Sequence, residues 1–447
     1  MEFGNEYIRF FKDNGIITEA AKTISGITKA NPGVVTASSH GYSNGDYVII
    51  SSVVGMTELN GRQFKVAGVT TNTFQLQDMD GNNFDTSSLT TYASAGSAFK
   101  IYQITSPYTT AQLFDIKFAQ SADVMYLVHP DVDIRKLTRT GHTSWTLATV
   151  SISGSPSPGL SGSDDRPSSV TFFEQRLVFA GTNNNPQSLW FSKAGAYENF
   201  TTGTNATDAM IYTIASNQVN AIRFMSNQTE LLIGTTGGEF IATSGTNSEP
   251  ITPTNIQITR QTNYGAANVD AIQIANVTMF LQRAKRKVRE MVYNYEVDGF
   301  IAPDMTILAE HITEGGLTSF AYQQEPDSIL WATRADGTLL GLTYQRNEKV
   351  VGWHRHILGG FSDSGKSIVR SFKSFTANST NVSTTNNTIT ISSHGFSTGD
   401  PVYYFTESNA IGGITTDLLY FAIATDSNTL KLATTSANAT AGTAVDL

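Results

Sequence analysis

The chain has 447 residues, 15% of them charged, with a formal net charge of -9 and no cysteine. Without cysteine, neither a disulfide framework nor thiolate chemistry is possible, and the acidic balance argues against a general nucleic-acid binder because phosphate contacts need Lys and Arg. No apolar run reaches the roughly 18 residues that a membrane span needs.

The N-terminal residues 1–26 predict a β-hairpin. Tyr7, Arg9 and Phe11 alternate with apolar residues, and the sequence Asp-Asn-Gly at residues 13–15 is a strong hairpin-turn signal. We therefore expect the chain to begin inside a sheet, as a hairpin that joins a larger β-domain later in the sequence.

Residues 27–103 form the next predicted domain, a small β-barrel-like module. Short strands of alternating hydrophobicity are separated there by Gly-containing turns. Residues 376–447 repeat this pattern, because His40 and His394 occupy matching His-Gly-aromatic sequences and both copies continue into a Gly-Asp turn. The two segments are therefore predicted to be two copies of one module.

Between the modules, residues 104–375 contain a repeated unit of short strands. In its clearest copy, residues 166–200, two β-rich runs flank the polar turn Glu174-Gln175, and a loop rich in Gly and Asn precedes a third run. Four other related segments begin near Leu113, Val219, Val269 and Leu317. A sixth unit opens at residues 367–375.

The spacing of these units predicts a β-propeller. They number about five and recur roughly every 50 residues, as propeller blades do. A sheet of three or four short strands cannot bury its own apolar face, so it must stack on others like itself. The expected fold class is all-β: an irregular β-propeller with two small β-barrel-like modules inserted in it or appended to it.

The two modules resemble the first catalytic-cysteine half-domain fold of ubiquitin-activating enzymes. The shared His-Gly-aromatic sequence and Gly-Asp turn carry this resemblance. No cysteine accompanies either module, so the resemblance implies the fold and no activation chemistry.

Longer motifs elsewhere resemble the tail tubular protein B, or nozzle, family of short-tailed bacteriophages. This resemblance covers roughly residues 2–24 and 104–375. The motifs include EFGNEYIRFF at residues 2–11, IRKLTR at 134–139, QRLVFAGT at 175–182 and KVREMVYNYEVDGFIAPDM at 287–305.

Membership of this family implies a structural protein of the virion tail. It implies a homo-oligomer, a hexameric ring below the portal and adaptor that continues the DNA-ejection channel. The implied partners are the adaptor or portal-side tail protein and the tail fibres or spike, and DNA passes through without specific binding. The alternative is a glycan-binding or glycan-cleaving tail protein used for host attachment, because propellers and small β-modules often bind sugars.

A dense positive cluster occupies residues 283–289. Three interpretations remain open: a contact with an acidic neighbouring subunit, a contact with DNA in a channel, or a solvated hairpin turn whose charges discourage edge pairing. The residues proposed for the inter-subunit or channel contact are Arg283, Lys285, Arg286, Lys287 and Arg289.

The sequence shows no catalytic or metal-binding constellation. His354 and His356 lie two residues apart, so on a strand they point the same way, but neither they nor His311 has a carboxylate at ligand spacing. No Ser-His-Asp order and no phosphate-binding loop occurs, although carboxylates alone leave glycosidase chemistry open. We therefore expect no bound metal, no cofactor and a protein that is not an enzyme.

Overall fold

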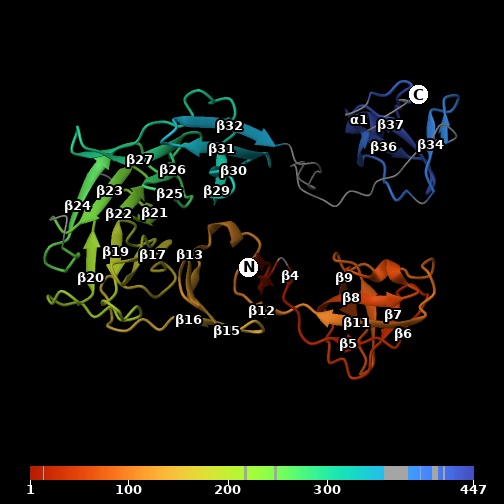
Figure 1. The fold of residues 1–447 in the computed structure, drawn as a ribbon, viewed down its shortest axis with the longest axis horizontal. Coiled ribbons are helices and arrows are strands. Elements are labelled where there is room, and N and C mark those ends of the chain that lie inside the picture. Colours follow the sequence, from red (N-terminus) through yellow and green to blue (C-terminus); the bar gives the residue numbers. More distant parts are fainter. Residues whose placement is uncertain are drawn as a thin grey trace. The chain divides into compact units, whose positions relative to one another are not determined.

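A computed structural model shows a protein whose regular secondary structure is almost entirely β-strand (Figure 1). It describes residues 1–13, 15–215, 219–245, 249–356, 381–392, 394–404, 411–415 and 418–447. Within these residues, one α-helix of five residues, α1 (Ser436–Thr440), accompanies the strands. The all-β prediction is thus confirmed. The chain divides into two compact units, Met1–Met305 and Thr306–Leu447, and each is described by itself.

The first unit contains four antiparallel sheets of four strands, each built from consecutive strands in chain order (Figure 1). The first two sheets comprise β13 (Lys117–Ser121), β14 (Val124–His129), β15 (Val132–Gly141), β16 (Ser144–Thr149), β17 (Ser169–Phe173), β18 (Arg176–Ala180), β19 (Ser188–Phe191) and β20 (Met210–Thr213). The next two comprise β21 (Ile222–Asn227), β22 (Leu231–Thr235), β23 (Gly238–Thr243), β24 (Gln257–Thr262), β25 (Ile272–Ile274), β26 (Val277–Leu281), β27 (Val288–Asn294) and β28 (Gly299–Ile301).

Consecutive sheets pack face to face through their second strands. In β18, Leu177 and Phe179 point to one side and share a core with Tyr126 of the preceding sheet. Val178 points to the other side and shares a core with Ile233 of the following sheet. Successive side chains of a strand alternate between faces, so an unbroken apolar strand is the sequence signature of a sheet that is covered on both sides. This stacking is the arrangement of propeller blades.

The N-terminal segment forms a small sheet of its own that packs on the first four-stranded sheet. Its strands are β1 (Glu2–Gly4), β2 (Tyr7–Arg9) and β12 (Gln103–Thr105), and a short hairpin of β3 (Phe11–Lys12) and β4 (Gly15–Ile16) follows. Ile8 and Phe10 share a core with Met125 and Leu127 of β14. The intervening residue Tyr126 faces the second four-stranded sheet, so the N-terminal sheet covers the opposite face of the first one.

The second unit contains a further four-stranded sheet of the same construction. Its strands are β29 (Leu317–Gln323), β30 (Ile329–Arg334), β31 (Leu339–Gln345) and β32 (Val350–His356). The four-stranded sheets therefore correspond to the five repeated units of the sequence. The sixth unit, predicted to open at residues 367–375, lies outside the described residues.

Residues 22–100 form a seven-stranded sheet around a separate core. Its strands are β5 (Lys22–Thr23), β6 (Gly26–Ile27), β7 (Val34–Thr36), β8 (Tyr47–Val54), β9 (Gln63–Ala67), β10 (Thr73–Gln77) and β11 (Ser94–Lys100). The sheet begins at Lys22, five residues before the start of the predicted module, and Gln103, at the end of that module, belongs to the N-terminal sheet.

The C-terminal module repeats the order of five adjacent strands of this sheet. Its strands are β33 (Val382–Ser383), β34 (Thr388–Thr390), β35 (Pro401–Tyr404), β36 (Leu418–Ala424) and β37 (Thr429–Ala433). Their spatial order, β33-β34-β37-β36-β35, reproduces the order β6-β7-β10-β9-β8 of the first module strand for strand. The sequence repeat therefore corresponds to a repeat of topology.

The matching histidines hold the same turn in both modules. The ring of His40 accepts from the backbone N–H of Tyr42 through Nδ1 at 3.0 Å and donates through Nε2 to the carbonyl of Thr73 at 3.2 Å. His394 makes the same two bonds, to the backbone N–H of Phe396 at 2.9 Å and the carbonyl of Asp426 at 2.9 Å. The two bonds require the neutral imidazole with its proton on Nε2.

Replacing His40 with Ala should destabilise the first module locally. The change leaves a buried N–H and a carbonyl without their partners, which costs about 1–3 kcal/mol. Hydrogen-exchange mass spectrometry of the full chain should show about 10- to 100-fold faster exchange in peptides from residues 27–103. His142→Ala, at an exposed hairpin turn, serves as the control. Unchanged exchange in the His40 variant would contradict this structural role.

Candidate functional site

The basic cluster predicted from the sequence lies on the hairpin turn between β26 and β27. Arg283, Lys285 and Arg286 are exposed there. Lys287 instead forms an ion pair with Asp304, with 2.7 Å between Nζ and Oδ2. The exposed part of the cluster is therefore limited to three cations on one tight turn.

Arg289 belongs to the interior of the protein. Only 9% of its surface is exposed. Its guanidinium lies 3.4 Å from the ring centre of Tyr264, Nη1 donates to the carbonyl of Ala302 at 2.6 Å, and Nε donates to Gln282 at 2.8 Å. These bonds occupy the guanidinium within its own subunit, so Arg289 cannot reach a neighbouring subunit or a channel in this conformation. An inter-subunit or channel contact by Arg289 stays a prediction, which the burial of this side chain does not favour.

The paired histidines of β32 lie together, as their spacing predicts. Nδ1 of His354 is 2.8 Å from Nε2 of His356, and both rings contact Trp331. Burial lowers the pKa of His354, and the neighbouring His356 lowers it further. Among the described residues, no group of three or more His, Asp or Glu side chains is arranged to hold a metal ion.

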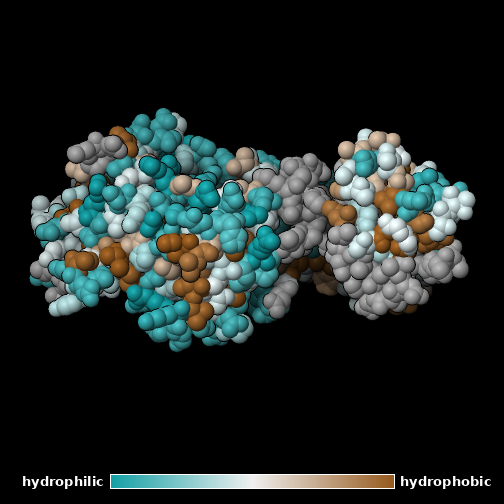
Figure 2. Space-filling model, turned by 90° about the horizontal axis from the view of Figure 1, so that it is seen from above, coloured by the Kyte–Doolittle hydropathy of each residue, from teal (hydrophilic) through white to brown (hydrophobic). Residues whose placement is uncertain are grey.

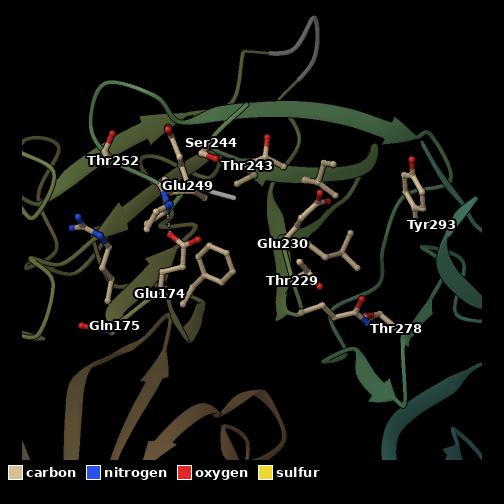
Figure 3. Close-up of a pocket in the computed structure, with 18 of the residues that line it drawn as sticks. Glu174, Gln175, Thr229, Glu230, Thr243, Ser244, Glu249, Thr252, Thr278 and Tyr293 are labelled. Atoms are coloured by element: carbon tan, nitrogen blue, oxygen red, sulfur yellow. Dashed lines mark hydrogen bonds between the residues drawn. The ribbon is translucent and has the colours of Figure 1, made fainter. Parts of the chain in front are cut away.

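A cleft of about 1150 Å³ opens where the first hairpin turns of three consecutive sheets meet. The turns are those between β17 and β18, between β21 and β22, and between β25 and β26. Residues 243–244 and 249–252, at the end of β23 and after it, also line the wall. Figure 3 shows Glu174 and Glu230 reaching into this space from neighbouring hairpins, with Tyr293 beyond Glu230. We name this space the three-turn cleft.

Glu174 is held in place by the conformation of its own turn. Glu174 and Gln175 both have left-handed backbones, with φ of 44° and 60°, which is the geometry of a two-residue type I′ hairpin turn. One carboxylate oxygen of Glu174 accepts from the backbone N–H of Ile251 at 2.6 Å. The side chain therefore joins the second sheet to the loop that follows β23.

Glu230 is the carboxyl group whose surroundings are most unusual in the cleft. It is half-buried, and its Oε2 atom has no hydrogen-bond partner among the described residues. Burial raises the pKa of this carboxyl, because desolvation penalises the charged form. A buried acceptor without a partner can bind a donor from a ligand at little cost.

The one basic side chain that lines the cleft within the described residues is directed into the protein. Arg176 is 2% exposed, and burial lowers its pKa. Its guanidinium donates to three backbone carbonyls, those of Ser192 at 2.6 Å, Asp208 at 2.6 Å and Ala206 at 2.5 Å. The charge visible to a ligand is therefore that of the carboxylates Glu174, Glu230 and Glu249.

In the comparison with known proteins, a family model matches within the first module. Residues 30–101 match the ubiquitin-activating enzyme E1 FCCH domain. Over 65 residues the chain is 45% identical to ubiquitin-like modifier-activating enzyme 1 of Oryctolagus cuniculus and 43% identical to that of Homo sapiens. These matches span 14% of this chain and 6% of the length of either relative. The predicted resemblance of the first module to a domain of ubiquitin-activating enzymes is thus confirmed, and it concerns this small domain.

Solved structures resemble the chain at low identity. The β-propeller domain of Cps50 (Swd1) from Myceliophteria thermophila is 7% identical, with 71% of this chain and 85% of that chain covered at a TM-score of 0.35. The periplasmic gluconolactonase PpgL of Pseudomonas aeruginosa is also 7% identical, with 77% and 87% covered at a TM-score of 0.38. Likeness at this level concerns the fold.

The prediction that the chain is not an enzyme is contradicted. The similar solved structures include the gluconolactonase and a luciferin-regenerating enzyme, the latter 12% identical with 52% of this chain and 73% of that chain covered at a TM-score of 0.31. The likeness identifies no substrate and no reaction for this chain.

Two arginines of the basic cluster should respond differently to substitution. Arg289→Met should destabilise the protein by about 3 kcal/mol because it leaves a buried carbonyl and amide unsatisfied. Arg286→Met, on the exposed turn, should change the free energy of unfolding by less than about 0.5 kcal/mol. Urea unfolding of the two variants measures the difference. Equal effects would show that Arg289 is not part of the packed interior.

Glu230→Gln should stabilise the protein at neutral pH but not in acid. The folded-state pKa of Glu230 lies above its unfolded value of about 4.3. At pH values between the two pKa values, the folded state therefore binds more protons than the unfolded state. The contribution of Glu230 to stability consequently falls as pH rises. The advantage of the glutamine variant should appear as pH increases from about 4 to 7. Urea unfolding at both pH values tests this, with exposed Glu296→Gln as the control.

Proposed function

We propose that the chain is a structural component of the tail of a short-tailed bacteriophage, of the tail tubular protein B or nozzle type. The supporting observation is that the motifs that resemble this family coincide with structural strands. The motifs at residues 2–11, 134–139 and 175–182 contain β1 and β2, part of β15, and β18. The resemblance therefore involves the residues that build the sheets.

In this role about six copies form a ring that continues the DNA-ejection channel below portal and adaptor. The adaptor or portal-side tail protein and the fibres or spike are its neighbours. Genome exit requires weak contact, because each retained phosphate contact holds the DNA. The net charge of -9 supports a wall that repels DNA. Among the described residues, no helix has the length and apolar character of a membrane span.

Exposed apolar side chains support an assembly with further copies or neighbours. The surface visible in Figure 2 is mostly hydrophilic but is interrupted by brown, apolar patches. Phe114 is 94% exposed, and Tyr295 and Val297 on the turn between β27 and β28 are 88% and 63% exposed. Tyr295 and Val297 share one turn, and neighbouring exposed apolar groups on a polar surface are typical of interaction sites.

The second candidate is a glycan-binding or glycan-cleaving tail protein. The three-turn cleft favours it, because hydroxyl, amide, carboxyl and aromatic side chains converge on one large concave space. Binding of a saccharide uses this combination of hydrogen-bonding side chains and aromatic ring faces.

Reversing the exposed basic charge should weaken the ring. We expect the wild-type chain to form rings of about six copies and Lys285→Glu with Arg286→Glu to shift them toward monomers, while the subunit stays folded because exposed charges contribute little to stability. Lys12→Glu with Lys29→Glu makes the same change of charge on other exposed sites. Mass photometry and negative-stain imaging count the copies.

The possible outcomes separate the three interpretations of the basic turn. Rings that persist but release DNA abnormally would place the turn in the channel, and rings with normal release would leave it as a solvated turn. A wild-type chain that stays monomeric at every concentration would refute the nozzle proposal itself.

A further inference from the structure

We propose that the three-turn cleft is a binding site for a neutral saccharide chain, with the carboxyl group of Glu230 as its anchor. This inference rests on the second candidate function and gives that function a site and a ligand class. The cleft measures about 1150 Å³, slightly above the usual range of about 300–1,000 Å³ for small-molecule sites. It therefore has room for several linked sugar units.

The wall of the cleft is rich in neutral hydrogen-bonding groups. Two of them are already ordered, because Nε2 of Gln228 donates to Oγ1 of Thr278 at 2.7 Å. Such groups both donate and accept, as sugar hydroxyls do. The hydroxyl and amide side chains that line the cleft include Gln228, Thr229, Thr243, Ser244, Thr252 and Thr278.

An aromatic surface stands beside these polar groups. Tyr293 is 50% exposed, and its ring meets that of Phe300 edge to face with 5.7 Å between ring centres. The Tyr293 hydroxyl donates to Asp298 at 2.6 Å, which fixes the direction of the ring. The exposed part of such a ring can pack against the apolar C–H face of a sugar.

The charges of the cleft determine which saccharides fit. Glu174, Glu230 and Glu249 supply carboxyl groups, and the guanidinium of Arg176 is bound to backbone carbonyls. A phosphate, a uronate or a sialate would meet like charge here without a compensating cation, which disfavours binding. DNA is excluded from the cleft by the same reasoning. A neutral ligand avoids this repulsion.

Glu230 is the anchor because its Oε2 atom is buried and has no partner among the described residues. The Oε2 atom is shielded from solvent in this conformation, so the Glu230 side chain must turn toward the cleft for a sugar hydroxyl to donate to it. Burial raises the pKa of this carboxyl, so near its pKa the same group can also hold a proton and donate it to a ligand oxygen.

The test is binding of defined oligosaccharides to the full chain by isothermal titration calorimetry. The probes are the neutral hexamers of maltose-, cellulose- and chitin-type, with oligogalacturonate as the acidic comparison. We expect at least one neutral hexamer to bind and the acidic one not to bind. Glu230→Ala and Tyr293→Ala should each weaken binding about tenfold or more, whereas Glu296→Gln outside the cleft should leave it unchanged.

Glu230→Gln provides the check on charge and folding. It keeps the size of the side chain, so it should retain neutral binding better than the alanine variant while reducing the repulsion of oligogalacturonate. Absence of neutral binding, binding that is insensitive to both alanine variants, or tighter binding of the acidic probe would overturn the proposal. None of these outcomes bears on ring formation, which is measured separately.

Discussion

Burial of both faces of the second strand is the constraint on which each four-stranded sheet of the first unit depends. In β18 the side chains of Leu177, Val178, Phe179 and Ala180 are all fully buried. Each large apolar side chain contributes about 1.5–3 kcal/mol when buried, but only if a neighbouring sheet covers it. A single sheet would leave one or both faces in water, so the sheets stabilise one another and none is a folding unit by itself.

Polar contacts also connect four-stranded sheets that do not follow one another directly along the chain. Lys117, at the start of β13, donates to the backbone carbonyl of Arg223 in β21 and forms an ion pair with Asp270 at 3.0 Å, just before β25. Nearby, Asn268 donates to Asp115 at 3.1 Å. The Lys117 side chain is only 7% exposed, so its charge needs these partners. The first sheet is thus fixed to the third and to the segment that leads into the fourth.

The sequence was sufficient to predict the strands but not the cleft. Hydrophobic periodicity and turn residues predict the repeated units. The polar pair Glu174-Gln175 predicts a turn because a two-residue polar break between β-rich runs has few other interpretations. To predict the cleft, one must know that the equivalent turns of three units lie together in space. Aligning the first turn of each unit would have placed Glu230 beside Glu174. Arg286 is exposed on its turn, whereas Arg289 is buried and hydrogen-bonded, and composition cannot show this difference.

The two candidate sites lie at opposite ends of one strand. The basic turn precedes β27, whereas the residues of β27 that line the three-turn cleft, Met291 and Tyr293, lie in the second half of the strand. Six residue steps along an extended strand separate these ends by about 20 Å. Exposed charges so far apart interact weakly at physiological ionic strength, since the Debye length is about 8 Å. Assembly through the basic turn and ligand binding in the cleft can therefore coexist in one subunit, and substitutions at one site leave the other intact.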